Sequence, residues 1–188
     1  KEIAKLSVRG IRDLGVAHIP EDRIRTGCDV SASVYDNLIA LDYVKQSRFG
    51  FMRERALKKE CKERVEKYSI KGTIAQKLSS LSGGNMQKVV VARELESNPV
   101  LVIADQPTRG IDVGAISFIH KKLVEMRDAG CAVLLVSADL GEVYDLADRI
   151  LVFHEGEITA EITDVKHTDE EQLGRYMLGV ERMVIGNE

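Results

Sequence analysis

The order of apolar and polar positions changes at Leu81. Beyond it, short continuous apolar runs cover residues 100–104 and 131–136, and a stretch with helical period between them, 114–128, ends before Gly130. Apolar runs without alternation are typical of parallel strands buried on both faces between helices. The sequence therefore predicts an α/β fold with a mostly parallel sheet.

The rest of the chain adds further predicted elements. A short strand over residues 15–19 ends at Pro20, and Ser33 is predicted to cap a helix that reaches about Leu41. We also expect a helix over 53–68, a short helix over 140–146 and a hairpin of strands 150–153 and 158–162. Apolar positions that define helix faces are Leu57, Cys61, Val65 and Tyr68, and at the C-terminal end Met177, Leu178 and Val180.

Composition excludes several classes of protein. The chain has 188 residues, of which 44% are hydrophobic and 30% charged, a composition typical of globular proteins. Its net charge of −3 is unlike that of a general nucleic-acid binder, which is usually basic. Its longest apolar runs are shorter than the about 18 residues of a membrane span. The three cysteines and four histidines lack metal-ligand or disulfide spacing, which favours a reducing, cytoplasmic setting: Cys28, Cys61, Cys131, His18, His120, His154 and His167.

Positive charge is concentrated in one segment. Residues 45–71 hold ten Lys and Arg against four Glu, although the whole chain is acidic. Two interpretations remain open: a solvated helix face, or contact with an anionic membrane surface or with an acidic patch of a partner.

The candidate chemistry lies in two segments. Ser82, Gly83 and Gly84 open a helix, where free N–H groups and the helix dipole favour an anion, although an ordinary capped helix start has the same pattern. About twenty residues further on, Asp105 ends an apolar strand, where ligands bind in parallel sheets. A carboxylate there can hold Mg²⁺ directly or through water.

These segments resemble the nucleotide-binding domain of ABC transporters. LSGGNMQK (81–88) looks like the signature motif, 100–105 like the Walker B strand, 110–112 like the D-loop and 148–156 like the family's DRI…EG strand pair. PTRGIDVGA (107–115) and PEDR (20–23) are similar to the second nucleotide-binding half of ribose, galactose or nucleoside importers. The resemblance covers about residues 1–165. It implies a partial P-loop NTPase-like core (1–27 and 96–165), a helical subdomain (28–95) and a helical tail (166–188).

The resemblance also implies roles for individual residues. ATP and Mg²⁺ are the implied cofactors, and Asp105 is the residue implied to hold Mg²⁺ through water. Glu21 occupies the Q-loop position. The implied ATP contacts are Ser82, Gly83, Gly84, Asn85, Gln87 and, in the D-loop, Asp112.

Besides Glu21, which stands where the family has the glutamine of the Q-loop, three features depart from the family pattern. No G-x-x-x-x-G-K-[ST] loop occurs, which indicates either a piece of a longer protein or a domain naturally without that loop. Gln106 occupies the position of the general-base glutamate, by nature or by engineering, and its amide cannot take a proton. Ala138 occupies the position of the switch histidine. This half is therefore expected to have a degenerate site of its own and to donate its signature in trans.

The resemblance implies that the longer protein is the ATP-binding and hydrolysing subunit of an importer for a simple sugar or a nucleoside. Its expected partners are another ABC half, in the same chain or as a second copy, a permease that contacts residues 30–37, and indirectly an extracellular solute-binding protein. We expect no nucleic-acid partner, a peripheral location on the cytoplasmic side of the plasma membrane, and no ATPase activity for these 188 residues alone. Alternatives are a non-transport ABC ATPase of translation or DNA repair and a regulatory ABC half.

Overall fold

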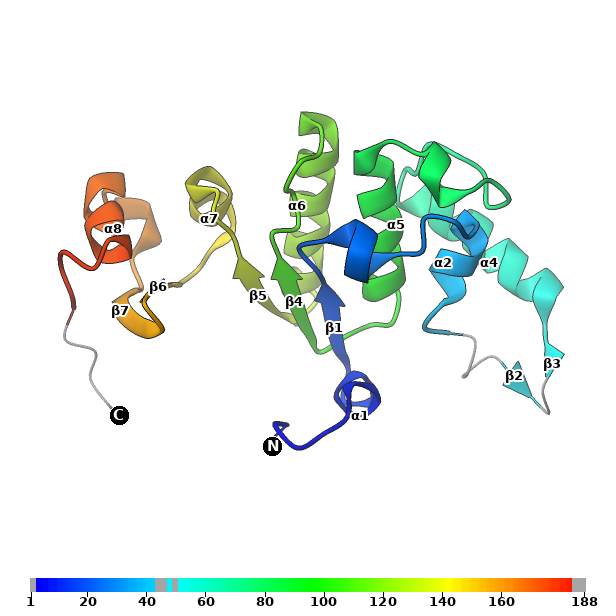
Figure 1. Ribbon diagram of the computed structural model, residues 1–188, viewed down its shortest axis with the longest axis horizontal. Coiled ribbons are helices and arrows are strands. Elements are labelled where there is room, and N and C mark those ends of the chain that lie inside the picture. Colours follow the sequence, from blue (N-terminus) through cyan, green and yellow to red (C-terminus); the bar gives the residue numbers. More distant parts are fainter. Residues whose placement is uncertain (1–2, 43–46, 49–50, 184–188) are drawn as a thin grey trace. The chain divides into compact units, whose positions relative to one another are not determined.

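The computed structural model describes residues 3–42, 47–48 and 51–183, and the chain divides into two compact units (Figure 1). The first unit is Lys1–Val136 and the second is Ser137–Glu188. The predicted boundaries between core, helical subdomain and tail follow a different scheme and stay a prediction.

A three-stranded parallel sheet organises the first unit. Its strands are β1 (Val16–Ile19), β4 (Leu101–Asp105) and β5 (Ala132–Val136), in the order β1-β4-β5. In the central strand, Val102 and Ala104 are fully buried. Because all three strands run the same way, their carboxyl ends meet at one edge of the sheet, where β4 ends at Asp105 beside Val136. The predicted α/β class is confirmed.

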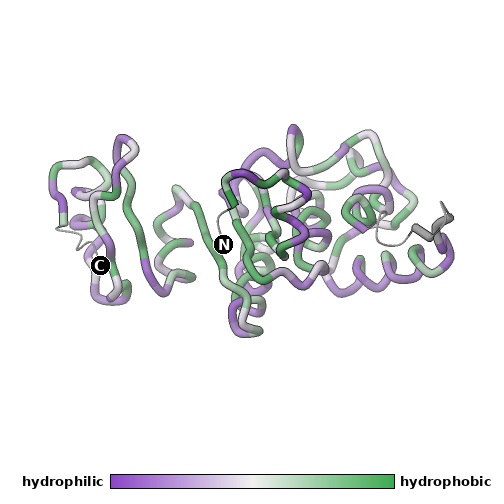
Figure 2. The backbone as a smooth tube through the Cα atoms, turned by 90° about the horizontal axis from the view of Figure 1, so that it is seen from below, coloured by the Kyte–Doolittle hydropathy of each residue, from purple (hydrophilic) through white to green (hydrophobic). Residues whose placement is uncertain are grey.

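Two long helices cover this sheet. Helix α5 (Gly83–Leu95) packs against β1, and α6 (Val113–Asp128) packs against β5 and against α5. The short helix α1 (Val8–Asp13) precedes β1. In α5 the run from Val89 to Ala92 has no exposed surface. In Figure 2, hydrophobic backbone segments lie among the packed helices and strands of the first unit.

The regular structure between β1 and α5 is mainly helical. It contains a π-helical turn η1 (Arg23–Gly27), α2 (Val34–Ile39), the strands β2 (Ser47–Arg48) and β3 (Phe51–Met52), α4 (Glu54–Lys67) and a 3₁₀ turn η2 (Leu78–Ser80). Ser33 caps α2 in a capping box with Asp36, as predicted. Helix α4 buries Leu57 and Cys61 on the predicted face and packs against α2.

The second unit has its own small core. Helix α7 (Leu140–Leu146) is followed by the antiparallel strands β6 (Ile150–His154) and β7 (Glu157–Ile162), a 3₁₀ turn η3 (Val165–His167) and α8 (Glu170–Met177). The predicted hairpin is confirmed, and both residues of its turn, Glu155 and Gly156, have positive φ (48° and 82°). Its core contains Ile150, Val152, Ala160, Ile162, Val165, Leu173 and Tyr176.

Two expectations about burial are wrong. Strand β5 is not buried on both faces, because Leu134 and Val136 are 51% and 47% exposed while the alternate residues are better covered. At the C-terminal end, Leu178 and Val180 are exposed, since α8 ends at Met177 and Gly179 has a φ of 69°. The packed residues of α8 are instead Leu173 and Tyr176.

Within the described ranges, no helix combines the length and the apolar character needed to cross a membrane.

Candidate functional site

Ser82 is the N-cap of helix α5. Its backbone is extended, so the helix begins after it. Its side-chain oxygen accepts hydrogen bonds from the Asn85 N–H (3.4 Å) and from the Asn85 side-chain amide (2.9 Å). Asn85 in turn accepts from the Lys71 N–H at 2.7 Å. Ser82 is exposed, and neither of its two accepted bonds uses the hydroxyl hydrogen. The tip of α5 therefore presents a hydroxyl donor beside the first N–H groups of a helix.

The two glycines after Ser82 serve different contacts. A Cβ at Gly84 would lie 2.5 Å from Asp112 Oδ2 and 2.8 Å from Ala115 Cβ, so close packing of α5 on the start of α6 requires glycine there. At Gly83 the nearest atom would be the flexible end of Arg23, at 3.0 Å. Asp112 caps α6 by accepting from the Ala115 N–H at 3.0 Å. Gly84 is thus explained by packing within the chain, without a ligand.

Gln87 joins α5 to the loop after β4. Its side-chain amide donates to the Pro107 carbonyl at 2.8 Å, and the residue is only 2% exposed. Its side-chain oxygen is buried and has no hydrogen-bond partner among the described residues. In this structure Gln87 holds the loop that follows Asp105 and Gln106, and its predicted contact with ATP stays a prediction.

Asp105 and Gln106 occupy the carboxyl edge of the sheet. Asp105 is half-buried at the end of β4. Gln106 has a positive φ of 47°, and its N–H donates to the Val136 carbonyl at 2.8 Å. A left-handed backbone at a residue other than glycine is uncommon and tends to occur where a site demands it. This conformation produces the sharp turn after β4. The Arg109 N–H donates to the Gln106 carbonyl at 3.1 Å across that turn.

Two arginines, neither of which was predicted to have a role of its own, hold the loops at the same edge of the sheet. Arg23 donates to the carbonyls of Arg109 (2.9 Å) and Gly110 (3.3 Å). Arg109 forms an ion pair with Glu21, the residue at the Q-loop position. A depression of about 430 Å³ is lined by Glu21, Asp22, Arg23, Ile24 and Arg109. The PEDR and PTRG segments were the available signal, because each places an arginine in the turn that follows a strand, four residues beyond its end.

The remaining predicted site residues lie elsewhere. Ala138 belongs to the second unit, where it precedes Asp139, the N-cap of α7. In the predicted permease segment, Asn37 is buried and donates to the carbonyls of Asp29 and Ser33 at 2.8 and 2.9 Å. Tyr35 of the same segment is half-buried, and burial raises its pKa.

The structure brings no metal-binding cluster of His, Cys, Asp and Glu side chains together among the described residues. All three cysteines are free thiols. Burial raises the pKa of Cys28, Cys131 and Cys61, in the last case to about 11, which makes reactive thiolates scarce.

Comparison with known proteins identifies the class of fold. A solved ATP-binding cassette, described as a dimer in a post-hydrolysis state bound to ADP and phosphate, resembles the chain with a TM-score of 0.67 at 22% identity, over 84% of this chain and 68% of that one. At that identity the likeness shows the fold, which is that of an ATP-binding cassette.

The family follows from the sequence match. Residues 12–109 match the family described as "ABC transporter", and the chain belongs to it. It is 41% identical over 182 residues to the nucleoside import ATP-binding protein NupA of Lactococcus lactis subsp. cremoris (strain MG1363), covering 95% of this chain and 36% of that protein. It is 42% identical over 185 residues to the guanosine import ATP-binding protein NupO of Bacillus subtilis (strain 168), with the same two coverages of 95% and 36%. The chain therefore spans about a third of the length of these relatives.

Proposed function

We propose that the chain is part of the ATP-binding and hydrolysing subunit of an ABC importer, and that its signature loop completes an ATP site built on another ABC half. The observation that carries this proposal is the tip of α5. There an exposed Ser82 stands at the start of a buried helix that is held to the loop after β4 through Gln87 and Gly84.

The donors at this tip fit a triphosphate. Ser82 can donate its hydroxyl hydrogen, and the first N–H groups of α5 have no acceptor within the helix. The helix dipole adds partial positive charge at the same point. Since the tip is exposed, an ATP held by a second ABC half can reach it from outside the chain. The likeness to a cassette solved as a dimer with ADP and phosphate is in keeping with such a pairing.

The chain's own sheet edge supports a weaker role in hydrolysis. Mg²⁺, when bound, supplies positive charge that stabilises a transferring phosphoryl group. Asp105 is the residue that would hold it, and a half-buried carboxylate at a strand end suits that metal. The neighbouring Gln106 can orient a water molecule but lacks the basic oxygen needed to take its proton. We therefore assign hydrolysis to the site that this chain's signature completes.

The transported solute is proposed from the relatives. The match to proteins named for nucleoside and guanosine import favours a nucleoside. A simple sugar is the second candidate, because the chain is also 39% identical over 160 residues to the xylose import protein XylG of Thermoanaerobacter pseudethanolicus (strain ATCC 33223 / 39E). The permease is proposed to contact residues 30–37, next to the capping box of α2.

The experiment compares substitutions in the importer assembled from the ABC subunit that carries this chain and its permease. Ser82→Arg places a long cation on the proposed phosphate contact and is expected to lower ATP turnover about a hundredfold, the order found when one transition-state donor is lost. Gln106→Ala is expected to lower turnover by less than about twofold, because its amide takes no proton.

Ser79→Arg is the matched control, since Ser79 is exposed three residues earlier on the adjoining 3₁₀ turn. It should leave turnover unchanged. The proposal fails if Gln106→Ala abolishes turnover while Ser82→Arg preserves it. A Ser82→Arg importer with normal turnover and normal uptake would instead favour a regulatory half.

A further inference from the structure

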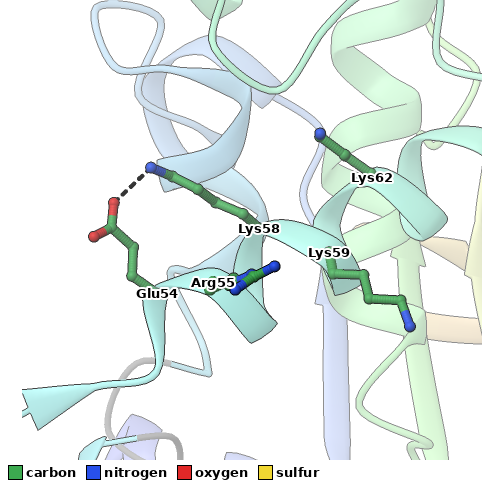
Figure 3. A pocket seen from close by; sticks show the side chains of 5 residues that line it. All are labelled: Glu54, Arg55, Lys58, Lys59 and Lys62. Carbon is green, nitrogen blue, oxygen red and sulfur yellow. Dashed lines mark ion pairs between the residues drawn. The ribbon is translucent and has the colours of Figure 1, made fainter.

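Helix α4 carries a row of four cations on its outer face. Arg55, Lys58, Lys59 and Lys62, here called the basic stripe, are all exposed and recur at helical spacings of three, one and three. They lie on one side of the helix because Leu57 and Cys61 bury the other. Figure 3 shows Lys58 reaching toward Glu54 and the other basic side chains projecting from the same helix. Together with Glu54 the stripe lines a depression of about 500 Å³.

Two of the four cations form exposed ion pairs, and two form none within the described part of the chain. Lys58 pairs with Glu54 at 2.6 Å, and Lys59 lies 3.8 Å from Glu63, but both lysines remain 50% and 80% exposed. No ion pair in the described part of the chain engages Arg55 or Lys62. Surface pairs of this kind stabilise a fold by less than about 1 kcal/mol, so folding alone gives little reason for the stripe.

The surroundings of the stripe point to a flat anionic surface. Helix α4 packs against α2, the helix of the proposed permease segment, and α2 begins inside that segment. Between Arg53 and Tyr68 no large hydrophobic side chain is exposed. A folded protein partner usually needs a buried apolar or aromatic anchor, whereas attraction to lipid headgroups needs only charge. The stripe is also short, about 10 Å from its first to its last residue, and straight because it follows one helix.

We propose that the basic stripe binds the anionic headgroups of the membrane in which the permease lies. This inference rests on the proposed function only for placing the chain beside a membrane. The stripe then holds the α2 and α4 pair against the bilayer while the permease contacts α2.

The test measures binding of the chain to vesicles without ATP or permease. The probes are vesicles of equal parts phosphatidylcholine and phosphatidylglycerol, and vesicles of phosphatidylcholine alone, with bound protein measured by co-sedimentation. The variant is Arg55→Gln with Lys59→Gln and Lys62→Gln. It leaves the Lys58–Glu54 pair in place, and glutamine keeps nearly the helix propensity of the residues it replaces.

The unmodified chain is expected to bind the anionic vesicles and not the neutral ones. Each cation near such a surface contributes about fivefold in affinity, so the triple variant should bind about a hundredfold more weakly. Binding should also disappear in about 1 M salt, where charges are screened within about 3 Å. A control with Lys5, Lys121 and Lys166 changed to Gln removes equal charge from exposed positions elsewhere and should retain binding.

Three results would overturn the inference. These are equal binding to neutral vesicles, unchanged binding by the triple variant, and equal loss in the control. Tighter binding to an acidic peptide such as polyglutamate than to the vesicles would also overturn it and assign the stripe to a protein partner. Because the assay contains no ATP, its failure leaves the outcome of the Ser82→Arg experiment untouched.

Discussion

Helices α4 and α5 are nearly equal in length, 14 and 13 residues, but they expose different parts of themselves. Helix α5 is buried along most of its length and presents its tip, where Ser82 caps it. Helix α4 buries only Leu57 and Cys61 and presents a whole face. The comparison teaches that a helix buried along its length exposes its N-terminus, whereas a helix packed on one face exposes a row of side chains.

The charges of the two helices differ in the same way. Glu94 of α5 has no exposed surface and accepts from Arg12 (2.8 Å), from Arg93 (2.9 Å) and from the His18 N–H (3.3 Å). This carboxylate joins α5 to α1 and to β1. In the basic stripe of α4, by contrast, the charges face solvent. Charge on α5 therefore stabilises the fold, and charge on α4 remains available to a partner.

The largest expected effect is the loss of Glu94. Glu94→Ala leaves the 10% exposed Arg93 side chain without its carboxylate, and breaking such a buried pair lowers the free energy of unfolding by about 4 kcal/mol. Urea denaturation followed by circular dichroism measures the loss.

The matched change on α4 is Lys59→Ala, which removes a side chain that is 80% exposed. It should alter stability by less than about 0.5 kcal/mol. Similar losses for Glu94→Ala and Lys59→Ala would contradict the contrast between the two helices.

A smaller loss is expected from closing the gap between the tip of α5 and α6. Gly84→Val forces a branched side chain against Asp112 and Ala115, and overpacking of this kind destabilises by about 3 kcal/mol. Gly83→Ala meets the flexible end of Arg23 and, at an ordinary contact distance of 3.6 Å, the Gly110 carbonyl oxygen, so it should change stability by less than about 1 kcal/mol. Denaturant midpoints of both variants measure the difference. If Gly84→Val is as stable as Gly83→Ala, the tip is not packed as described.

The smallest effect concerns pH and the inner face of α4. Burial raises the pKa of Cys61 from 9.0 to about 11, so the folded chain keeps this proton where the unfolded chain releases it. The resulting stability is complete below 9.0 and is lost as pH rises toward about 11.

Between about pH 8 and about pH 10 we expect Cys61→Ala to lose about 1 kcal/mol less stability than the unmodified chain. Leu57→Ala, which removes a buried side chain that does not titrate, is the control and should keep the pH dependence of the unmodified chain. Parallel pH profiles for Cys61→Ala and the unmodified chain would show that Cys61 does not titrate differently on folding.

The sequence was informative wherever one local pattern decided an element. Strand β4 followed from an apolar run of strand length, and the start of α2 followed from Ser33 with Asp36 three residues on. The hairpin of the second unit followed from two apolar runs around Glu155-Gly156. The family was identified from contiguous motifs, above all residues 81–88.

What escaped prediction depends on distant partners. The role of Arg23 rests on carbonyls 86 and 87 residues away, and that of Gln87 on a carbonyl 20 residues away. The exposure of Leu134 depends on which elements cover β5. A continuous apolar run does not distinguish a strand buried on one face from a strand buried on both faces. The packing of Gly84 against Asp112 also went unpredicted, because the two residues lie far apart in the sequence, and the contact of Gly84 with ATP stays a prediction.

The hydrogen bond from Gln87 to Pro107 has a mechanical consequence. Gly84 packs against Asp112, and Arg23 donates to two carbonyls of the same loop, so the tip of α5 and the turn after Asp105 are joined into one wedge. If the tip grips a nucleotide on a neighbouring half, any displacement of that nucleotide pulls on the wedge as a whole. Under the proposed function, movement of that nucleotide would therefore displace the turn after Asp105 together with the tip of α5.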